Sequence, residues 1–201
     1  MTDQPHIRPV PPAELFAPVP LDKSYRLMNH GPTVLVSARH GGVDNVMAAA
    51  WACVLDFGEA PKVTVVLDKA TRTRELIERS GSFALQLPCV AQASLTVAVG
   101  THSARELPDK MARLGVSLFK APGLDVPLVE GCVGWLACRL LPEPHNQHTY
   151  DLFIGQVEAA WADPRVFSQG RWHFDTAPDS LRTLHHVAGG QFIVAGPAVQ
   201  G

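Results

Sequence analysis

The segment Asn45–Trp51 has the clearest chemical potential in the chain, because it carries successive alanines inside an apparent strand. Alanine is a poor strand former, so this composition is unusual on propensity alone. Small side chains let a flat ring lie against the main chain, whose N–H groups can then stabilise charge on the polar edge of the ring. The alternative is a small-residue strand packed under a helix, which the periodicity alone favours.

The segment Lys69–Glu75 lies between a predicted strand and a predicted helix. The N-terminus of a helix offers free N–H groups and the positive end of the helix dipole, which suits a phosphate. Hydroxyl and cationic side chains can strengthen such a site. In this segment they are Thr71, Thr73, Lys69, Arg72 and Arg74. The alternative is an ordinary helix start with solvated basic residues.

A third polar segment, Thr101–Arg105, is followed by Asp109–Met111. The hydroxyl of Ser103 and the ammonium of Lys110 could close over the same phosphate, or over the chain that links the phosphate to the ring. The alternative is a polar loop followed by a solvated helix start.

The sequence lacks the usual nucleotide-binding loops. It contains neither G-x-G-x-x-G nor the Walker pattern, and no G-x-S-x-G elbow, so a bound nucleotide must be held in another way. Nine histidines are present, including His145 and His148, but neither H-E-x-x-H nor C-x-x-C accompanies them. We therefore expect no metal site.

The composition is that of a globular chain. Hydrophobic residues make up 46% and charged residues 18% of the 201 residues, and the net charge is −2. Basic and acidic residues are interspersed, so nucleic-acid binding is not expected. No apolar run is long enough to span a bilayer, and the start of the chain lacks the features of a signal peptide, so we expect no membrane association and a cytoplasmic location. The four cysteines are then expected to be reduced and mostly buried.

Strand patterns outnumber helix patterns along the chain. Strands are expected at 33–37, 48–55, 62–67, 82–87, 133–141 and 152–161, and helices at 73–79, 90–99 and 109–114. A polar loop is expected at Pro142–Asp151, and loop or a short edge strand after Leu184. The prolines of residues 1–22 predict an extended N-terminal arm before a domain at 23–201. Because the strands do not alternate regularly with helices, we expect a mainly β fold, an antiparallel β-barrel with helical excursions.

Four short patterns follow one another in a recognisable order. They are Asn-x-Met-x-Ala-x-Trp at Asn45–Trp51, Thr-Arg-x-x-Ile at Thr73–Ile77, Ser-x-Arg with Lys-Met at Ser103–Met111, and His-Thr with Leu-Phe-Ile-Gly-x-Val at His148–Val157. In order and spacing they resemble the flavin reductase family of FMN-binding split barrels, which includes flavoredoxin-like proteins. The resemblance covers the chain from Val34 to Val157.

The resemblance implies a Greek-key FMN-binding split barrel that holds FMN non-covalently at a homodimer interface. It implies FMN contacts from Asn45, Met47, Ala48, Ala49, Ala50 and Trp51, and phosphate contacts near Lys69, Thr71, Thr73, Ser103 and Lys110. It also implies hydride transfer to the flavin from NADH or NADPH, which binds transiently. Hydride transfer needs aligned rings more than a protein acid or base, so no catalytic residue is assigned. His148 is a candidate donor near the rings, and the alternative is a loop histidine bonded to a carbonyl.

Two departures from the family pattern leave alternatives open. Similar proteins often carry hydroxyl residues at the positions of Ala48 and Ala50, and often read Gly-Asp-His-Thr where this chain reads Asn146–Thr149. The main hypothesis is an NAD(P)H:flavin oxidoreductase, or flavin reductase, with an oxygenase or another electron-acceptor protein as a partner. The alternatives are a flavoredoxin-like electron carrier without NAD(P)H oxidation of its own, and a flavin-free interaction protein on the same fold.

Overall fold

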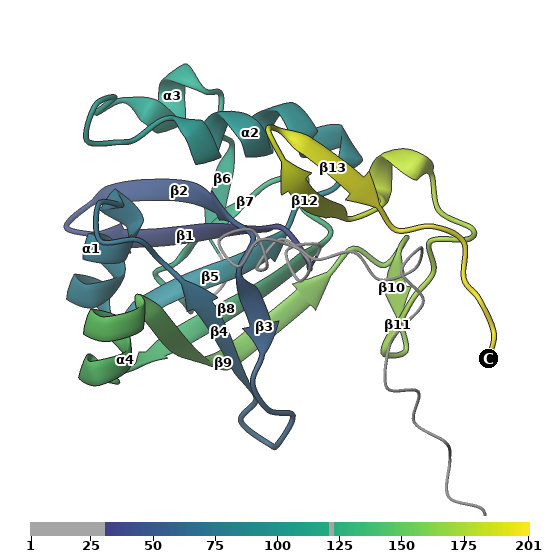
Figure 1. Ribbon diagram of the computed structural model, residues 1–201, viewed down its shortest axis with the longest axis horizontal. Helices are drawn as coiled ribbons and strands as arrows, with labels where there is room; N and C mark the ends of the chain where they lie inside the picture. The colour runs from purple at the N-terminus through teal and green to yellow at the C-terminus, as the bar shows by residue number, and fades with distance from the viewer. Residues whose placement is uncertain (1–30, 121–122) are drawn as a thin grey trace, which may run out of the picture.

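A curled antiparallel sheet dominates the computed structural model, which describes residues 31–120 and 123–201. The seven strands, in the order β2-β1-β5-β8-β9-β4-β3, form a half-barrel (Figure 1). The prediction of a mainly β fold with helical excursions is therefore confirmed. The predicted N-terminal arm, residues 1–22, lies outside the described residues, and the domain boundary stays a prediction.

The elements of the described chain have the following bounds. The sheet strands are β1 (Val34–His40), β2 (Val43–Ala49), β3 (Ala52–Val54), β4 (Lys62–Val66), β5 (Ser82–Leu87), β8 (Gly134–Leu141) and β9 (Leu152–Ala162). Separate hairpins are β6–β7 (Leu118–Lys120, Pro127–Val129), β10–β11 (Phe167–Ser168, Arg171–Trp172) and β12–β13 (Leu184–Ala188, Gln191–Val194). The helices are α1 (Arg72–Ser80), α2 (Ala93–Thr101), α3 (Lys110–Arg113) and α4 (Pro144–Tyr150), with 3-10 turns at Val90–Gln92 and Asp179–Leu181.

β2 forms one edge of the sheet, since within the described ranges β1 is its only strand partner. The turn between them consists of Gly41 and Gly42, with φ angles of 58° and 77°. Positive φ at both central residues is the geometry of a type I′ hairpin turn, whose twist matches that of the strands. The resulting register sets Met47 opposite Val36. The Gly-Gly turn thus brings the alanine segment to the edge of the sheet.

The interior of the half-barrel holds the main hydrophobic core, which includes residues of α1. Phe83 and Phe153 are fully buried in it. Gly155 makes room for the Phe83 ring, because a Cβ at this position would lie 2.4 Å from a ring carbon. A larger residue at Gly155 would have to displace the ring or the strand, which overpacks the core.

A second apolar cluster covers the other face of β1 and β2, beneath α2. Its buried members are Leu35, Val46, Val99, Val129 and Cys132. Because side chains alternate along a strand, Val46 and Ala48 pack in this cluster while Met47 and Ala49 pack against the main core. β2 is therefore packed on both faces, and its main chain is open only along the edge away from β1.

The prediction of a polar loop at Pro142–Asp151 is wrong, since α4 occupies most of this range. Pro144 stands in the first turn of α4, where its missing N–H costs no hydrogen bond. The N–H of Glu143 donates to the side-chain oxygen of Gln147 at 2.9 Å, so a side chain further along satisfies the helix start. Asp151 ends the helix with a φ of 55°. The polar composition of this segment therefore gave no sign of the helix, whose two ends are formed by Glu143 and Asp151.

Most of the other predicted strands and helices agree with the structure. The strands expected at 33–37, 62–67, 82–87, 133–141 and 152–161 and the helices expected at 73–79 and 109–114 are confirmed, with shifts at their ends. The helix expected at 90–99 divides into a 3-10 turn and α2. A single strand at 48–55 is wrong, because β2 ends at Ala49 and the chain crosses to pair β3 with β4. The short edge strand expected in the tail is the hairpin β12–β13.

Three of the four cysteines are buried, as expected: Cys89, Cys132 and Cys138, whereas Cys53 is exposed. Burial raises the pKa of the Cys138 thiol to about 12, so this side chain behaves as an apolar core residue. Among the described helices, none combines the length and the apolar character that a membrane span requires.

Candidate functional site

A cavity of about 550 Å³ lies against the end of β2 and the start of β3. Its lining comes from segments that are far apart in the sequence, namely Met47–Trp51, Val66 with Asp68, Asp151, and His186–Gly189. The volume falls within the range of small-molecule and cofactor sites. The alanine segment singled out in the sequence therefore borders a cavity, which the tertiary structure builds from β4, α4 and the hairpin β12–β13.

The small residues Ala48–Ala50, which we call the alanine wall, have two roles in this structure. Ala48 packs under α2, where a Cβ on Gly100 would lie only 3.2 Å from the Ala48 Cβ. The packed-strand interpretation is thus correct for one face of β2. The same residues, half-buried, also leave the main chain close to the cavity. Trp51 stands at the end of this wall with 51% of its surface exposed.

A smaller cavity of about 250 Å³ lies between β2, α2 and the hairpin β12–β13. It shares Ala48, Ala49, Ala50 and His186 with the first cavity. Its remaining lining includes the polar residues Thr33, Thr96 and Thr101 and the ring of Phe192. The two cavities together form one recess around the end of β2.

The N-terminus of α1 approaches the first cavity through the turn Asp68–Thr71. Thr71 is the N-cap residue, but its side chain makes no capping hydrogen bond to the helix. Its hydroxyl instead donates to the main-chain oxygen of Asp68 at 2.8 Å. The first N–H groups of α1 are consequently left for solvent or a ligand. Lys69 is exposed beside this turn, with its ammonium 3.9 Å from Asp151.

Cationic side chains gather around this helix start. Arg105 donates to the main-chain oxygen of Ala70 at 2.9 Å and to Glu75 at 3.2 Å. Arg72 also pairs with Glu75, and their hydrogen bond is the main reason why the pKa of Glu75 is lowered. The hydroxyl of Ser103 accepts the main-chain N–H of Arg105 at 3.2 Å. The structure thus brings the segment containing Ser103 next to Lys69–Glu75, as the hypothesis of a shared phosphate site requires.

Asn45 and Thr73 are both buried and join β2 to α1. The amide nitrogen of Asn45 donates to the Thr73 hydroxyl at 2.8 Å. The amide oxygen of Asn45 has no hydrogen-bond partner among the described residues. A buried oxygen without a donor is costly, so it offers an acceptor to a ligand or a water molecule. Direct FMN contacts from these residues stay predictions.

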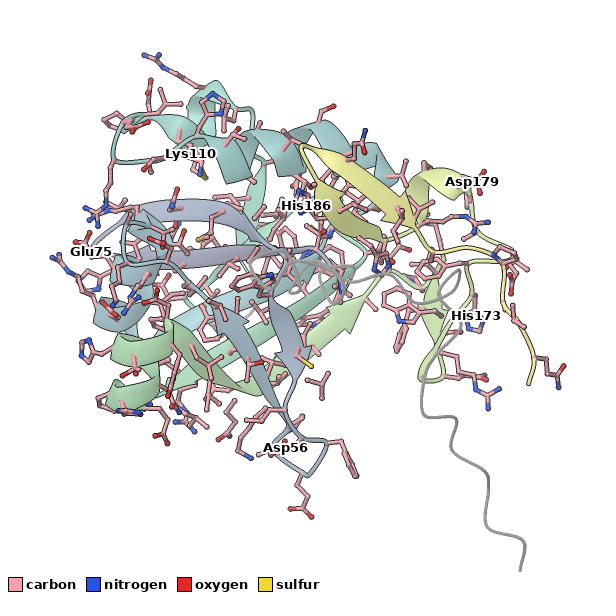
Figure 2. The ribbon with its side chains drawn as sticks, viewed as in Figure 1. Asp56, Glu75, Lys110, His173, Asp179 and His186 are labelled. Atoms are coloured by element: carbon pink, nitrogen blue, oxygen red, sulfur yellow. The ribbon has the colours of Figure 1, made fainter. Side chains whose placement is uncertain are left out.

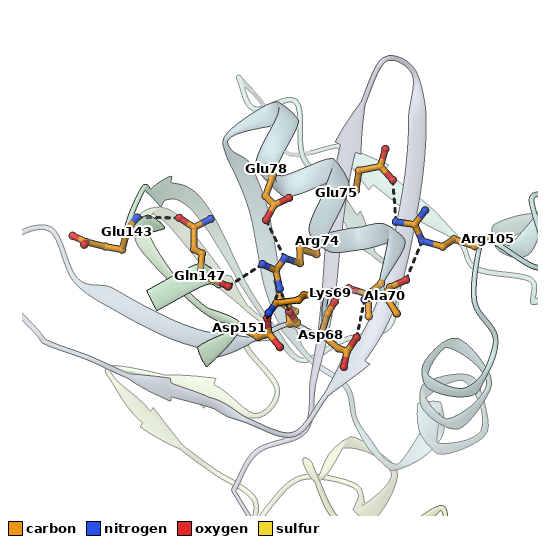
Figure 3. A network of polar contacts seen from close by, with 12 residues as sticks. Asp68, Lys69, Ala70, Arg74, Glu75, Glu78, Arg105, Glu143, Gln147 and Asp151 are labelled. Carbon is orange, nitrogen blue, oxygen red and sulfur yellow. Dashed lines mark hydrogen bonds and ion pairs between the residues drawn. The ribbon is translucent and has the colours of Figure 1, made fainter. Parts of the chain in front are cut away.

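Arg74 has a different role from the phosphate contact considered above. Its guanidinium donates to Leu67 O at 3.0 Å, to Gln147 O at 2.8 Å and to the Asp151 carboxylate at 2.5 Å (Figure 3). It also bonds Glu78 at 2.9 Å. Burial acts to lower the pKa of Arg74, but the bonds to Asp151 and Glu78 outweigh it and leave this pKa raised. Arg74 therefore ties α1, β4 and α4 together behind the first cavity.

Lys110 is the first residue of α3, and its buried side chain reaches between β2 and α2 (Figure 2). Its ammonium donates to the main-chain oxygens of Val46 and Val99, at 2.8 Å each. It also borders a third cavity of about 750 Å³, together with Asn45, Arg72 and Arg105. A phosphate contact by Lys110 stays a prediction, since its observed donors already meet main-chain carbonyls.

The histidine in the recess is His186 and not His148. His148 is exposed on α4 and is absent from the lining of both cavities. His186 is half-buried and lines both cavities. Its main-chain N–H donates to the Thr33 hydroxyl at 2.9 Å, and its imidazole ring contacts Phe192 edge to face. The sequence signal was the Gly189-Gly190 turn, which closes the hairpin that carries His186. Within the described ranges, no cluster of three or more potential metal ligands occurs.

Comparison with protein families gives one extended match. The model described as the flavin reductase like domain matches residues 25–181. The Escherichia coli K12 protein YddH is 45% identical over 187 residues, which is 92% of this chain and 97% of that protein.

Solved structures with the same fold agree with this match. An FMN-binding domain of a flavin reductases-like enzyme from Shewanella baltica OS155 has 58% identity and a TM-score of 0.84, covering 92% of this chain and 96% of its own. The flavoredoxin of Desulfovibrio vulgaris (Miyazaki F) has 24% identity and a TM-score of 0.71, covering 85% and 90%. At that identity the second similarity shows the fold alone, and the fold that all these proteins share is the split barrel.

Proposed function

This chain belongs to the flavin reductase-like family, and from that premise we propose that it is an FMN-binding flavin oxidoreductase that accepts hydride from NADH or NADPH. The observation that carries the proposal is the position of the first cavity next to the uncapped start of α1. Small residues with open main chain line the cavity on its β2 side, and exposed cations lie beside the turn that leads from Asp68 to α1. A flat ring joined by a flexible chain to a phosphate fits both sides at once.

The alanine wall supports the proposed position of the ring. Because β2 is a sheet edge, its outward main-chain N–H groups and carbonyls have no strand partner in the described chain. Bound FMN would supply the hydride-accepting ring, and fixed N–H donors favour its reduced, more negative form. Ala48 and Ala50 bring no hydroxyl, so the contacts on this side come from the main chain. The absence of side-chain bulk is itself a reason why a ring fits here.

The start of α1 supports the proposed position of the phosphate. Free N–H groups and the positive end of the helix dipole attract an anion, typically by 0.3–1 kcal/mol or about 2 kcal/mol where the site is partly buried. Lys69 and Arg105 are 64% and 49% exposed, so both side chains can turn toward a phosphate without leaving a buried site. The segments of Thr71 and Ser103 lie beside them. The buried oxygen of Asn45, on β2 next to Thr73 of α1, adds an unpaired acceptor.

The residues around the recess orient and screen the rings, and none of them needs to act as an acid or base. Hydride transfer requires two rings in contact with aligned faces, and the recess lined by β2 and the hairpin β12–β13 offers a surface on which they can stack. His186 and Asp151 line the first cavity, and Phe192 adds an apolar surface beside His186 in the second. His186 therefore replaces His148 as the candidate donor near an incoming nicotinamide.

A second copy of the chain is part of the proposal. The sheet edge formed by β3 and the turn after it carries exposed apolar side chains: Val54 is 68%, Leu55 51% and Phe57 96% exposed. Apolar side chains gathered at an exposed sheet edge are typical of surfaces that meet another protein. The edge adjoins Trp51 at the first cavity, so a partner on it would also shield the ring. Homodimerisation follows from the family resemblance, and this surface supports it.

The electron acceptor and the location stay predictions. We propose transfer from reduced flavin to an oxygenase or another electron-acceptor protein, in the cytoplasm. The fold similarity to a flavoredoxin is the reason for a second candidate function, that of an electron carrier that does not oxidise NAD(P)H itself.

One anaerobic titration tests the proposal. Purified protein is mixed with FMN, the bound fraction is followed by the quenching of flavin fluorescence, and NADH or NADPH is then added. We expect tight, saturable binding followed by bleaching of the visible flavin bands on the timescale of turnover. Bleaching with dithionite or a donor protein alone would favour the electron carrier. Protein that takes up no FMN would contradict both and leave the interaction protein.

A further inference from the structure

Lys110 is a buried cation at the contact between β2 and the C-terminal end of α2 (Figure 2). Only 2% of its surface is exposed. Its ammonium donates to Val46 O and to Val99 O, each at 2.8 Å. Val99 lies in the last turn of α2, where main-chain carbonyls lack helical partners. Lys110 thus supplies donors to a strand carbonyl and a helix-end carbonyl at the same time.

The cost of burying Lys110 indicates how much those bonds matter. Asp44 and Asp109 border the same cavity, but they pair with Arg39 and Arg113, and no described carboxylate pairs with Lys110. Burial accordingly lowers the pKa of Lys110 to about 8. An ammonium without a carboxylate is expensive to bury, so its hydrogen bonds must offset that cost. The two carbonyls are held more firmly than neutral donors would hold them.

The carbonyl of Val46 points to the edge of β2 that faces away from β1. Successive residues of a strand direct their main-chain groups to alternate sides, so Ala48 directs its N–H and C=O to the same open edge. Gly100, which follows Val99, is the residue whose position limits the space beside Ala48. Lys110 therefore joins the open edge of β2 to the end of α2 through Val46 and Val99. These two residues lie next to the pair Ala48 and Gly100, where α2 packs on the alanine wall.

We propose that Lys110 is a positioning residue for the flavin ring, which acts through the main chain of β2 and not on the phosphate. The inference rests on the proposed binding of FMN along Met47–Trp51. It assigns Lys110 a role different from that of Lys69 and Arg105, whose exposed side chains are the candidates for the phosphate.

Riboflavin, which has the ring but no phosphate, separates the two roles. In Lys110→Met, we expect dissociation constants for FMN and for riboflavin to rise by the same factor, roughly 10- to 100-fold. In Lys69→Met and Arg105→Met, we expect weaker FMN binding with riboflavin unchanged. The visible circular dichroism of FMN at saturation should also change in Lys110→Met, because the wall under the ring has moved. Loss of FMN affinity with unchanged riboflavin affinity in Lys110→Met would overturn the proposal, as would wild-type affinity for both.

A matched control and a second variant keep the test decisive. Arg113→Met removes a cation from the same short helix, but Arg113 is exposed, so both affinities should stay unchanged. If Lys110→Met does not fold, Gly100→Ala tests the same contact, since its added Cβ presses on Ala48 while Lys110 remains. It should weaken FMN and riboflavin by equal factors, and unequal factors would count against the proposal. Wild-type protein that binds neither flavin would contradict the proposed function itself, a result distinct from any of these.

Discussion

Two buried cations join elements around the candidate site, Arg74 between α1 and α4 and Lys110 between β2 and α2, and their hydrogen-bond partners differ in kind. Arg74 bonds two main-chain carbonyls and also two carboxylates, Asp151 and Glu78. Lys110 bonds two main-chain carbonyls and no described carboxylate. The pKa of Arg74 is raised, whereas burial lowers the pKa of Lys110 to about 8.

This difference indicates which part of the site responds to pH. The Arg74 network behind the first cavity keeps its charge at every physiological pH, because arginine is always protonated and its carboxylates hold it so. Lys110, which bonds Val46 next to the alanine wall, has a pKa of about 8, so its charge changes just above neutral pH. We therefore expect the wall that faces the ring to be adjustable, and the turn that leads to α1 to be rigid.

The largest effect should come from Arg74→Met. It removes the donors of two main-chain carbonyls and leaves Asp151 without its closest cation, so unfolding should become easier by about 3–5 kcal/mol. Urea unfolding at neutral pH measures this difference. A loss below 1 kcal/mol would mean that the network is not what joins α1 to α4.

The next effect concerns pH and distinguishes the two cations. Lys110 has a pKa of about 8 in the folded chain against a usual value of 10.5, so between these pH values the unfolded chain holds a proton that the folded chain has released. Stability of the wild type relative to Lys110→Met should therefore rise with pH across this window, by roughly 3 kcal/mol in total. Below pH 8 the difference should be constant.

The matched comparison is the wild type against Arg74→Met over the same window. Arg74 stays charged in both states, so this difference should be flat. Urea unfolding of the three proteins from pH 7 to 10.5 checks both statements. A flat difference for Lys110→Met would show that Lys110 is not unusually easy to deprotonate.

A smaller effect is expected from Asp151→Asn. Asparagine tolerates the φ of 55° at this position and keeps an oxygen that accepts from Arg74, so only the charge is lost. We expect unfolding to become easier by about 1–2 kcal/mol. Asp151→Ala should cost more, because alanine tolerates the left-handed conformation poorly; equal losses would contradict this account.

The smallest effect should come from Glu78→Gln. The Glu78 side chain is 40% exposed, so water screens its pair with Arg74. A change of about 0.5 kcal/mol or less is expected from thermal or urea unfolding. A larger loss would indicate that the surface carboxylate, and not Asp151, is the main anionic partner of Arg74.

Much of the fold could be predicted because its signals are local. The β-branched run at 62–67 and the mainly apolar run at 82–87 predict strands whatever the rest of the chain does, and the Gly41-Gly42 turn fixes the first hairpin. α4 could not be predicted from polarity, since its start depends on a side-chain bond from Gln147 back to Glu143. The break between β2 and β3 was also hidden, because the apolar run continues through Ala50 and Trp51 while the pairing partner changes.

The candidate site, like the fold, could be predicted only in part from the sequence. The alanine wall and the helix start at Thr71 were visible in the sequence, and both border the recess or approach it. His186 was not singled out, because its position in the recess depends on a hairpin packed against β2 from the far end of the chain. Arg74 and Lys110 looked alike as basic residues near a phosphate, and only their surroundings tell them apart.

The sequence by itself determined the strand and helix periods, the small residues of Asn45–Trp51 and the order of patterns that indicates the family. The tertiary structure decided which carbonyl each buried cation meets. Lys110 reaches Val46 across 64 residues and Arg74 reaches Asp151 across 77. Such contacts arise when packing brings distant segments together, and the energy of a buried charge depends on those neighbours more than on the residue type. Two basic residues near helix starts therefore differ in their response to pH: Lys110 has a lowered pKa and Arg74 a raised one.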